Sequence, residues 1–304
     1  MKVYLSKINE SWIIDRVRKE WYINNKEIST KQIRNSDIIW IISPWLWKKI
    51  PKNQLVKKKV ICSHYHFDFD NFDKQDFYEL DKFVDEYHVI SKKTEEQLLT
   101  LTDKKITSIP FWIDPKLFYE ISDKKNLKKE LGFAEKDYLI GSFQRDSEGS
   151  NLDTPKLIKG PDIFFKLVSE KFSKNENVRV VLAGKRRNYL INKLSEKKIP
   201  FEYFEMVDTV KLNKLYNALD LYIVSSRIEG GPQAILECAI TKTPILSTDV
   251  GVAREILHSN SIYNIDDFNK SKVDIDYAYQ NAQLYKLPDG MKLFNQMLWD
   301  FYEN

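Results

Sequence analysis

The chain has 304 residues, of which 42% are hydrophobic and 30% are charged, so it is long enough for two domains with packed cores and is not a wholly disordered chain. Its formal net charge is +4, from 48 basic and 44 acidic residues, which is too balanced for a dedicated nucleic-acid-binding protein. The two cysteines, Cys62 and Cys238, lie in apolar contexts and exclude a disulfide framework and a cysteine-based zinc site.

The sequence contains no segment typical of export or membrane insertion. Residues 1–12 lack the apolar stretch of a signal peptide, and no run in the chain approaches about 18 consecutive apolar residues. We therefore expect a cytoplasmic protein, with peripheral attachment to the inner face of the membrane as an alternative.

The first third of the chain predicts alternating strands and helices. Residues 37–42 and 59–63 are continuous apolar runs, typical of strands buried on both faces of a parallel sheet. Ser91 is expected to cap the helix that follows it. The expected strands are 2–5, 37–42, 59–63, 86–90 and 106–109, and the expected helices are 12–21, 75–83 and 92–101.

The segment 110–115 separates two parts of different composition. Pro110 and Pro115 interrupt any regular element there. All nine glycines lie at or after Gly132, whereas six of the seven tryptophans lie at or before Trp112. The chain therefore has no N-terminal glycine-rich phosphate loop. We expect a short first domain over 1–113, a linker over 114–136, a second domain over 137–285 and a final segment over 286–304.

The second domain continues the same alternation more clearly. The expected strands are 138–142, 178–183, 201–205, 221–225 and 244–247, and the expected helices are 160–172, 187–197, 210–218, 234–241 and 253–257. A last amphipathic helix is expected over 291–302. Strands and helices joined by short links in this order predict an α/β fold with parallel sheets covered by helices.

One group of candidate ligand-binding residues follows the strand 221–225. Ligands bind at the carboxyl ends of strands in open α/β sheets. Gly230 and Gly231 allow the backbone to approach a ligand, and the helix that follows directs N–H groups and a positive dipole end at an anion. Glu229 and Glu237 carry carboxylates that can accept hydrogen bonds from vicinal hydroxyl groups, such as those of a ribose.

A second group contains two cations. Arg145 follows the strand 138–142, and Lys159 lies at the start of the next helix, where a cation is unfavourable unless an anion is bound. An arginine fork and a lysine point charge suit a diphosphate and can replace a metal ion. Two solvated cations in a lysine-rich chain are the alternative.

A third group, in the first domain, follows the strand 59–63. His64, His66 and Asp68 have the His-x-His-x-Asp spacing of some metal sites, but such sites need further histidines, and His88 and His258 are the only others in the chain. A metal-dependent hydrolase on these three residues is one alternative function. A histidine that hydrogen-bonds the backbone at a strand end is the structural alternative for His64.

The segment 45–59 combines tryptophans with lysines. Trp45, Trp47 and the lysines around 48–59 could contact an anionic membrane surface or a lipid-linked acceptor. A surface helix with a solvated face is the alternative that we favour.

These motifs together resemble those of the retaining GT-B glycosyltransferases of family four, glycosyl transferases group 1. The run SSRIEGGPQAILECAITKTPILSTDVG (225–251) resembles the family signature with two glutamates eight positions apart. GSFQR, followed by Lys159-Gly160, resembles its diphosphate site, and LYNALDLYIVSS (215–226) its approach to the glutamates. KITSIPFWIDPKLF (105–118) resembles its interdomain linker. The first domain lacks the glycine loop common in the family, and an insert over 147–158 separates Arg145 from Lys159.

The resemblance implies two Rossmann-like domains whose parallel sheets face a central cleft, with the last helix crossing back to the first domain. It implies that Arg145 and Lys159 hold the donor diphosphate and that Glu237 binds the ribose. Further implied contacts come from Glu229, Gly230 and Gly231 to the donor sugar or phosphate, from Met206 and Val207 to the base, and from His64, or His66 in second place, to the transferred sugar.

The resemblance thus implies transfer of a sugar from a UDP- or GDP-linked donor to an acceptor hydroxyl, with retention of configuration. The implied acceptor is a glycan or a lipid-linked glycan. No cofactor or metal is expected, since the cations and the helix dipole neutralise the departing diphosphate, and no nucleic acid is expected as a partner. A non-catalytic nucleotide-sugar-binding protein is the second alternative function.

Overall fold

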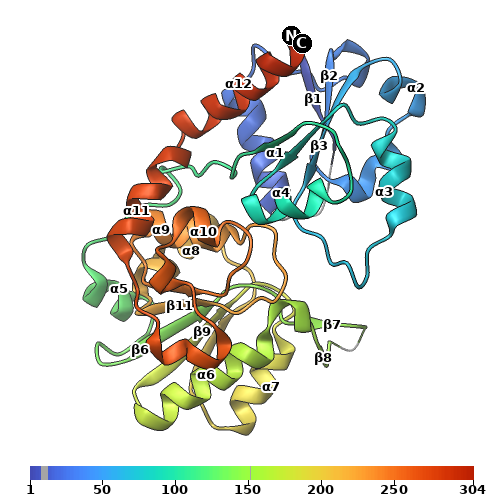
Figure 1. The fold of residues 1–304 in the computed structure, drawn as a ribbon. Coiled ribbons are helices and arrows are strands. Elements are labelled where there is room, and N and C mark those ends of the chain that lie inside the picture. Colours follow the sequence, from blue (N-terminus) through green and yellow to red (C-terminus); the bar gives the residue numbers. More distant parts are fainter. Residues whose placement is uncertain (8–12, 151) are drawn as a thin grey trace. The chain divides into compact units, whose positions relative to one another are not determined.

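The computed structural model describes residues 1–7, 13–150 and 152–304, which form two compact units. Unit 1 contains Met1–Trp112 and Tyr285–Asn304, and unit 2 contains Ile113–Leu284 (Figure 1). The division falls within the proline-flanked segment 110–115. Within the described residues, no helix is long and apolar enough to cross a membrane.

The described residues of unit 1 form a parallel sheet in the order β1-β2-β3-β4-β5. The strands are β1 (Val3–Leu5), β2 (Ile38–Ile41), β3 (Lys59–His64), β4 (Glu86–Val89) and β5 (Ile106–Ser108). Val3 also forms a parallel bridge with Ser29 on the side of β1 away from β2. The chain therefore moves outward from β1 in both directions, as in a doubly wound sheet.

Helices cover both faces of this sheet. They are α1 (Ile13–Asn24), α2 (Lys52–Leu55), α3 (Lys74–Asp81), α4 (Lys92–Leu99) and α12 (Asp289–Glu303). Residues of α1 and α12 share one buried cluster, and residues of α3 and α4 share another with Ile39 and Ile41. The Ser91 hydroxyl caps α4 by accepting a hydrogen bond from the Thr94 N–H, as predicted. Trp12, at the expected start of α1, lies outside the described residues.

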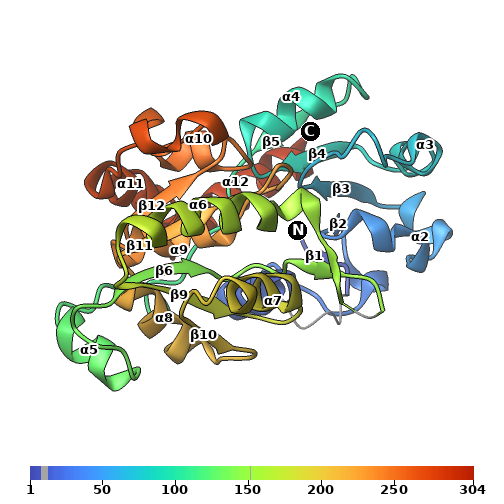
Figure 2. The ribbon, with the colours of Figure 1, turned by 90° about the horizontal axis from the view of Figure 1, so that it is seen from below.

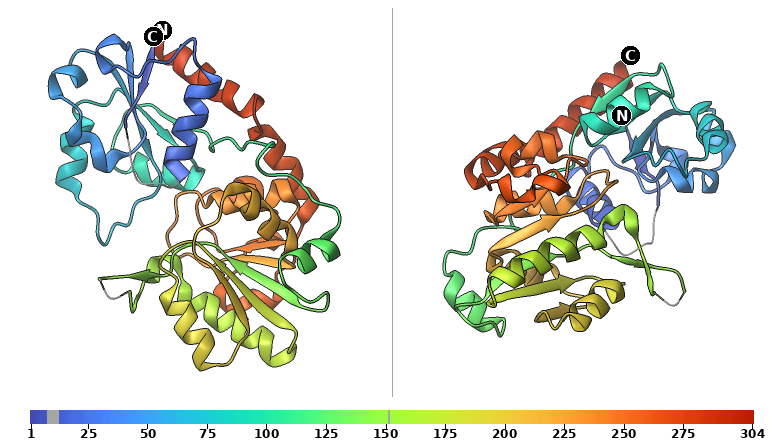
Figure 3. Two further views of the ribbon diagram at one scale, coloured as in Figure 1. Left: turned by 180° about the vertical axis from the view of Figure 1, so that it is seen from behind. Right: turned by 60° about the horizontal axis from the view of Figure 1, so that its bottom comes forward.

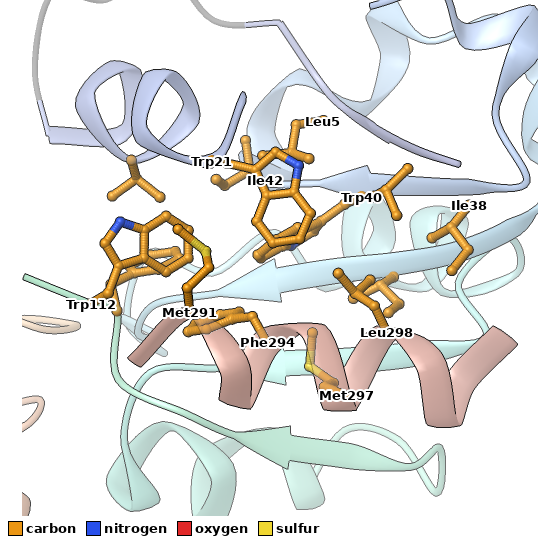
Figure 4. Packing of buried hydrophobic residues seen from close by; sticks show 14 of the residues in the cluster. Leu5, Trp21, Ile38, Trp40, Ile42, Trp112, Met291, Phe294, Met297 and Leu298 are labelled. Carbon is orange, nitrogen blue, oxygen red and sulfur yellow. The ribbon is translucent and has the colours of Figure 1, made fainter. Parts of the chain in front are cut away.

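Aromatic rings fill the core between the sheet and α12 (Figure 4). The ring of Trp40 on β2 packs 5.3 Å from that of Trp21 on α1 and 5.6 Å from that of Phe294 on α12. The ring of Trp112 lies 5.0 Å from that of Phe294, and its indole N–H donates to the Glu20 carboxylate at 2.8 Å. These rings attach the last helix of the chain to unit 1.

The sheet of unit 2 has the order β10-β9-β6-β11-β12, with all strands parallel. The strands are β6 (Tyr138–Ser142), β9 (Val178–Ala183), β10 (Phe201–Phe204), β11 (Leu221–Val224) and β12 (Ile245–Ser247). From β6 the chain passes to β9 and β10 in one direction. It then returns to β11, on the other side of β6, and continues to β12.

Helices cover both faces of the unit 2 sheet as well. They are α5 (Lys124–Glu130), α6 (Pro161–Lys174), α7 (Asn188–Glu196), α8 (Thr209–Ala218), α9 (Gln233–Thr241), α10 (Ala253–Ile256) and α11 (Ile275–Ala282). In Figure 1, α6 and α7 lie on one side of the sheet and α8 and α9 on the other, and Figure 2 shows α6 running along its face. This arrangement follows from right-handed crossovers that run from β6 through β9 to β10 in one direction and from β10 through β11 to β12 in the other.

Two parts of unit 2 differ from expectation. The segment 114–136, expected to be a linker, belongs to unit 2, because α5 packs against α8 and Tyr119 N–H donates to Asn213 Oδ1 at 3.1 Å. Within the insert 147–158, Ser147–Glu148 (β7) and Thr154–Pro155 (β8) pair as a short antiparallel hairpin. In both views of Figure 3, this hairpin extends away from the sheet of unit 2.

The ring cluster predicts a large effect of truncating Phe294, which is fully buried. We expect Phe294→Ala to lower the free energy of unfolding by about 3–5 kcal/mol, because it removes a ring and leaves a cavity among Trp40 and Trp112. The adjacent Leu293 is 42% exposed, and Leu293→Ala should cost about 1 kcal/mol or less. Urea unfolding followed by tryptophan fluorescence measures both. Equal losses for the two variants would contradict the packing of α12 in this core.

Candidate functional site

The direction in which the chain adds strands to the sheet of unit 2 reverses between β6 and β11, and we call this place the reversal point. β6 leads through α6 to β9 on one side, and β11 leads through α9 to β12 on the other. The loops that follow two such strands separate, and the carboxyl ends of the strands at this position are where open α/β sheets bind ligands. Here these loops are residues 143–146 and 225–229, which contain two of the residues predicted from the sequence, Arg145 and Glu229.

Lys159 and Glu229 meet at this reversal point. The Lys159 ammonium contacts Glu229 Oε2, with the side chains 16% and 17% exposed. Lys159 ends a short 3-10 turn before α6, and Glu229 lies in the loop between β11 and α9. The structure thus unites a cation and a carboxylate that are 70 positions apart in the sequence.

Gly160 allows the two loops to touch. Its φ is +60°, in the left-handed region, and a Cβ atom on it would lie 1.8 Å from the Ser225 carbonyl oxygen. No other residue fits against that carbonyl without moving the backbone. This close contact explains why a glycine follows Lys159 in the motif: only glycine lets this part of the chain approach the end of β11.

Two neutral side chains join the same group. Gln144 Nε2 donates to the Lys159 carbonyl at 2.9 Å, and the Ser226 hydroxyl lies 3.2 Å from Gln144 Oε1. The same hydroxyl lies 3.3 Å from Glu229 Oε2. Gln144, Ser226, Glu229 and Lys159 therefore form a closed ring of polar contacts. Gln144 and Ser226 were not singled out from the sequence, although both lie inside the quoted motifs.

A second set of bonds fixes the loop after β11 to the start of α6. Arg227 and Ile228 donate their backbone N–H groups to the Ile158 carbonyl at 2.9 and 3.1 Å. The Arg227 guanidinium also forms a two-bond pair with Asp162, at 2.8 and 2.6 Å. This pair lowers the pKa of the Asp162 carboxyl. The Lys159–Glu229 pair is therefore carried by loops that are bonded to each other.

Glu237 is buried on α9, just over one helical turn after the first residue of this helix. Its Oε2 atom accepts a hydrogen bond of 2.7 Å from the Tyr216 hydroxyl on α8, and the residue is 5% exposed. Burial and the nearby carboxylate raise the pKa of Tyr216 well above its usual value, so the phenol keeps its proton and remains a donor. The structure orients the Glu237 carboxylate through Tyr216, a partner that was not predicted.

The glycine pair precedes a helix that no side chain caps. Pro232 occupies the N-cap position of α9 and supplies no side-chain hydrogen bond. Gly251, with φ +51°, packs so closely that a Cβ atom on it would lie 2.3 Å from the Gly230 carbonyl oxygen and 2.9 Å from Gly231 Cα. A hollow of about 900 Å³ lies beside the loops that follow β11 and β12, and its lining includes Ser226, Arg227 and Thr248.

The other predicted donor residues lie at two places in unit 2. Arg145 directly follows Gln144, is exposed, and has no ion pair within the described part of the chain. Met206, which is 62% exposed, and Val207 follow β10 at the edge of the sheet. Three interstrand steps of about 4.8 Å separate β10 from β11, or about 14 Å in all. The structure therefore does not bring Met206 and Val207 to the Lys159–Glu229 pair, whereas Arg145 lies on the loop of Gln144, a member of the ring.

A buried ion pair holds the loop that carries Arg145. Arg187 Nε lies 3.0 Å from Asp146 Oδ2, and both side chains are at most 2% exposed. The Ser147 hydroxyl donates to Asp146 Oδ1 at 2.8 Å and accepts the Tyr189 N–H at 2.8 Å. Burial raises the pKa of Asp146, and the Arg187 charge opposes that rise. Arg187, the first residue of the expected helix 187–197, is thus part of the core.

His64 is enclosed by aromatic rings of unit 1. Its ring stacks on Phe67 at 5.0 Å and packs against Phe77 at 5.7 Å and Tyr87 at 5.6 Å. The residue is 8% exposed, and its Nε2 atom is buried without a hydrogen-bond partner in the described part of the chain. His64, expected to contact the transferred sugar, thus lies among aromatic side chains of the unit 1 core, next to the segment that follows β3.

The metal hypothesis requires a cluster of ligands that the described residues do not form. Nowhere in residues 1–7, 13–150 and 152–304 do three or more His, Cys, Asp or Glu side chains gather in a way that could hold a metal ion. Asp68, one of the three proposed ligands, accepts a hydrogen bond of 2.9 Å from the Asn71 amide. Nothing in the described residues thus favours the hydrolase alternative.

The segment 45–59 forms a 3-10 turn (Pro44–Lys49) and the short α2 rather than one surface helix. Trp45 is 47% exposed, but Trp47 is buried at 2% and its indole N–H donates to the Asp76 carboxylate at 3.2 Å. Lys59 donates to the carbonyls of Phe301 and Tyr302 at 3.0 Å. The expected pair of exposed tryptophans is therefore reduced to one.

The arrangement described so far is that of a GT-B type protein: two doubly wound parallel sheets, with a lysine, a glutamate and a glycine pair at the reversal point of the second and a further glutamate on the helix that follows. Residues 150–271 match the family model described as glycosyl transferases group 1. Lipopolysaccharide core biosynthesis mannosyltransferase LpsB from Rhizobium meliloti is 27% identical over 187 residues, 58% of this chain and 50% of that protein. The match thus spans about half the length of this curated relative.

Solved structures show the same fold. HepE from Anabaena, in complex with UDP, superposes with a TM-score of 0.76 at 13% identity over 98% of this chain and 99% of that chain. Sucrose-phosphate synthase from Thermosynechococcus elongatus gives 0.69 at 12% identity over 97% and 81%. The pneumococcal O-GlcNAc transferase GtfA, in complex with UDP and GlcNAc, gives 0.62 at 14% identity over 88% and 57%. The predicted GT-B fold and the predicted resemblance to group 1 glycosyltransferases are confirmed.

The burial of His64 predicts a pH dependence of stability. Burial lowers the pKa of His64 to about 3, whereas an unfolded histidine titrates near 6.5. The unfolded chain therefore binds more protons below pH 6.5, and the stability present above that pH is lost as the pH falls toward 3. For this one group the loss between pH 7 and pH 5 is about 2 kcal/mol.

We expect His64→Phe to lose about 2 kcal/mol less than the wild type between pH 7 and pH 5, because phenylalanine takes up no proton. Urea unfolding at the two pH values measures the difference within each variant, so a constant packing change cancels. The same pH loss in both proteins would show that His64 is not held neutral in the core.

Proposed function

We propose that this chain is a retaining glycosyltransferase that transfers a sugar from a nucleoside diphosphate donor to the hydroxyl group of an acceptor. The observation that carries this proposal is the contact of Lys159 with Glu229 at the reversal point of the unit 2 sheet. A cation and a carboxylate placed there match the two ends of a nucleotide sugar's reactive centre: the anionic diphosphate and the hydroxylated sugar.

In this proposal the diphosphate takes the place of Glu229 as the partner of Lys159. Arg145 has no ion pair among the described residues and is the second cation for the diphosphate. The start of α9, which no side chain caps, adds the positive end of a helix dipole beside Gly230 and Gly231. These groups neutralise the leaving diphosphate without a metal ion, so we propose no metal and no cofactor.

Glu229 then accepts hydrogen bonds from hydroxyl groups of the donor sugar, and Glu237 from the hydroxyl groups of the ribose. The bond between the anomeric carbon and the diphosphate oxygen breaks, and the acceptor oxygen attaches to the same face of the sugar. The acceptor proton passes to the departing diphosphate, so the reaction needs no general base from the protein. Retention of configuration and these roles rest on the resemblance to group 1 glycosyltransferases.

The nucleotide base lies against Met206 and Val207 in this proposal. The strand before these residues is about 14 Å from β11, the strand before Glu229, so a ligand that reaches both places is elongated, as a nucleotide sugar is. UDP or GDP is the proposed product, and UDP is the first to test because the HepE and GtfA structures contain it.

The proposed acceptor is a glycan or a lipid-linked glycan, since LpsB acts in lipopolysaccharide core biosynthesis by its name. Peripheral contact with an anionic membrane would use Trp45 and the exposed lysines 49, 52 and 57. A chain that binds the nucleotide sugar without transferring it is the alternative, and turnover separates the two.

One test of the proposed function concerns nucleotide binding. We expect calorimetry to show binding of UDP or GDP, equally with magnesium and with a chelator, and weakening of at least about tenfold in Lys159→Ala, because one charged hydrogen bond to the diphosphate is lost. Lys166→Ala is the matched control, since Lys166 is exposed on α6 and away from the reversal point. Binding that requires magnesium would contradict the proposed role of Lys159 and Arg145.

Another test of the proposed function concerns turnover. We expect release of nucleoside diphosphate from UDP- or GDP-sugars, with water or a glycan as acceptor, and proton NMR of the first product should show the anomer of the donor. Glu229→Gln should lower kcat about 10- to 100-fold, because an amide replaces the charged acceptor of the sugar's hydrogen bonds. Nucleotide binding without turnover would support the non-catalytic alternative, and the opposite anomer would contradict retention.

A further inference from the structure

The contacts of Ser226 differ from those of the other residues at the reversal point. Its hydroxyl lies almost equally far from two acceptors, 3.2 Å from Gln144 Oε1 and 3.3 Å from Glu229 Oε2. A serine hydroxyl has one proton and can donate to only one of these oxygens at a time. Ser226 therefore has two alternative acceptors, a neutral amide and a carboxylate.

The position of the Lys159 charge determines which of the two oxygens accepts the hydrogen bond from Ser226. In the structure, Lys159 contacts Glu229, so the carboxylate already has a donor. Gln144 is held in place, because its Nε2 atom donates to the Lys159 carbonyl at 2.9 Å and this bond turns its Oε1 atom toward Ser226. The Ser226 proton can then serve Gln144.

Binding of a diphosphate changes this distribution. When Lys159 turns to the diphosphate, Glu229 loses the cation, although it is only 17% exposed. Of the described side chains, Lys159 and Ser226 are the ones within hydrogen-bond distance of the Glu229 carboxylate. A partly buried carboxylate without a donor is unfavourable, and a hydrogen bond to a charged acceptor is stronger than one to a neutral amide.

We propose that Ser226 is a positioning residue that holds Glu229 once Lys159 has moved to the donor diphosphate, with Gln144 as the acceptor of its proton in the free protein. This inference rests on the proposed function and assigns a specific task to two residues outside the cations and glutamates. The exchange needs only rotation of the hydroxyl about its Cβ–Oγ bond.

The backbone around Ser226 is fixed in a way that suits this task. The residue is fully buried, its carbonyl accepts the Thr248 hydroxyl at 2.6 Å, and the next two N–H groups are bonded to the Ile158 carbonyl. The hydroxyl therefore stays in reach of Glu229 while Lys159, on a long flexible side chain, changes partner. Glu229 then keeps its orientation toward the sugar.

The decisive variant is Ser226→Ala, which removes the hydroxyl alone. Nucleoside diphosphate binding depends on Lys159 and not on the sugar, so we expect the Kd for UDP or GDP to stay within about threefold. We expect kcat for the sugar nucleotide to fall about 10- to 100-fold, as for loss of one hydrogen bond to a charged group. Unchanged nucleotide binding also shows that the variant is folded.

Ser247→Ala is the matched control. Ser247 ends the neighbouring strand β12, is fully buried like Ser226, and its hydroxyl donates to the Thr248 carbonyl at 2.8 Å, away from Glu229. It should retain both the Kd and the kcat of the wild type.

Two outcomes overturn the positioning role while the proposed function stands. They are an unchanged kcat in Ser226→Ala, and a parallel loss of nucleotide affinity and kcat, which a merely structural serine would produce. A wild-type chain that neither binds UDP or GDP nor releases them from sugar nucleotides would overturn the proposed function itself.

Discussion

The close approach of Gly160 to the Ser225 carbonyl is the constraint on which the site depends. It brings the start of α6 against the end of β11, and the Lys159–Glu229 and Gln144–Ser226 contacts of the ring cross that junction. The two loops follow β6 and β11, and from these strands the chain continues to opposite sides of the sheet, so the backbone alone would let the loops diverge. The Arg227–Asp162 pair and the shared Ile158 carbonyl reinforce the same junction from its outer side. A rigid frame then carries one mobile element, the long side chain of Lys159.

This frame explains how the free protein can keep two opposite charges in a partly enclosed place. Lys159 and Glu229 satisfy each other until an anion arrives, so neither charge is left unpaired. An anionic ligand then competes with an internal carboxylate for the lysine. Such competition weakens the binding of any anion that brings no hydroxyl groups for Glu229, and it favours a ligand that supplies both partners. A nucleotide sugar is such a ligand, which links the geometry of the pair to selectivity.

Much of the fold could be predicted because buried parallel strands have a strong signal. The apolar runs of β2, β3 and β9 lie within a residue or two of the expected ranges. Other parts lack such a signal: α5, with the sequence KKNLKKE, is almost entirely polar and is stabilised by its packing on α8, so its local pattern predicts a linker and not a helix. The tryptophans of the first third predict a part that differs from the second domain. The reason for this difference, an aromatic core that α12 completes from the far end of the chain, depends on contacts that no local pattern reveals.

The same limit separates the charged residues of the site from the neutral ones. Lys159 and Glu229 could be found because a cation at a helix start and a carboxylate beside two glycines are unusual locally. Gln144 and Ser226 are ordinary in a loop, and they gain their meaning only from two oxygens of different charge at nearly equal distance from one hydroxyl. His64 illustrates the converse: its spacing suggested chemistry, yet stacking on Phe67 makes it a core residue. In this chain, charged residues indicate where a ligand is expected to bind. The neutral Ser226 keeps the Glu229 carboxylate in its orientation when Lys159 moves to the ligand.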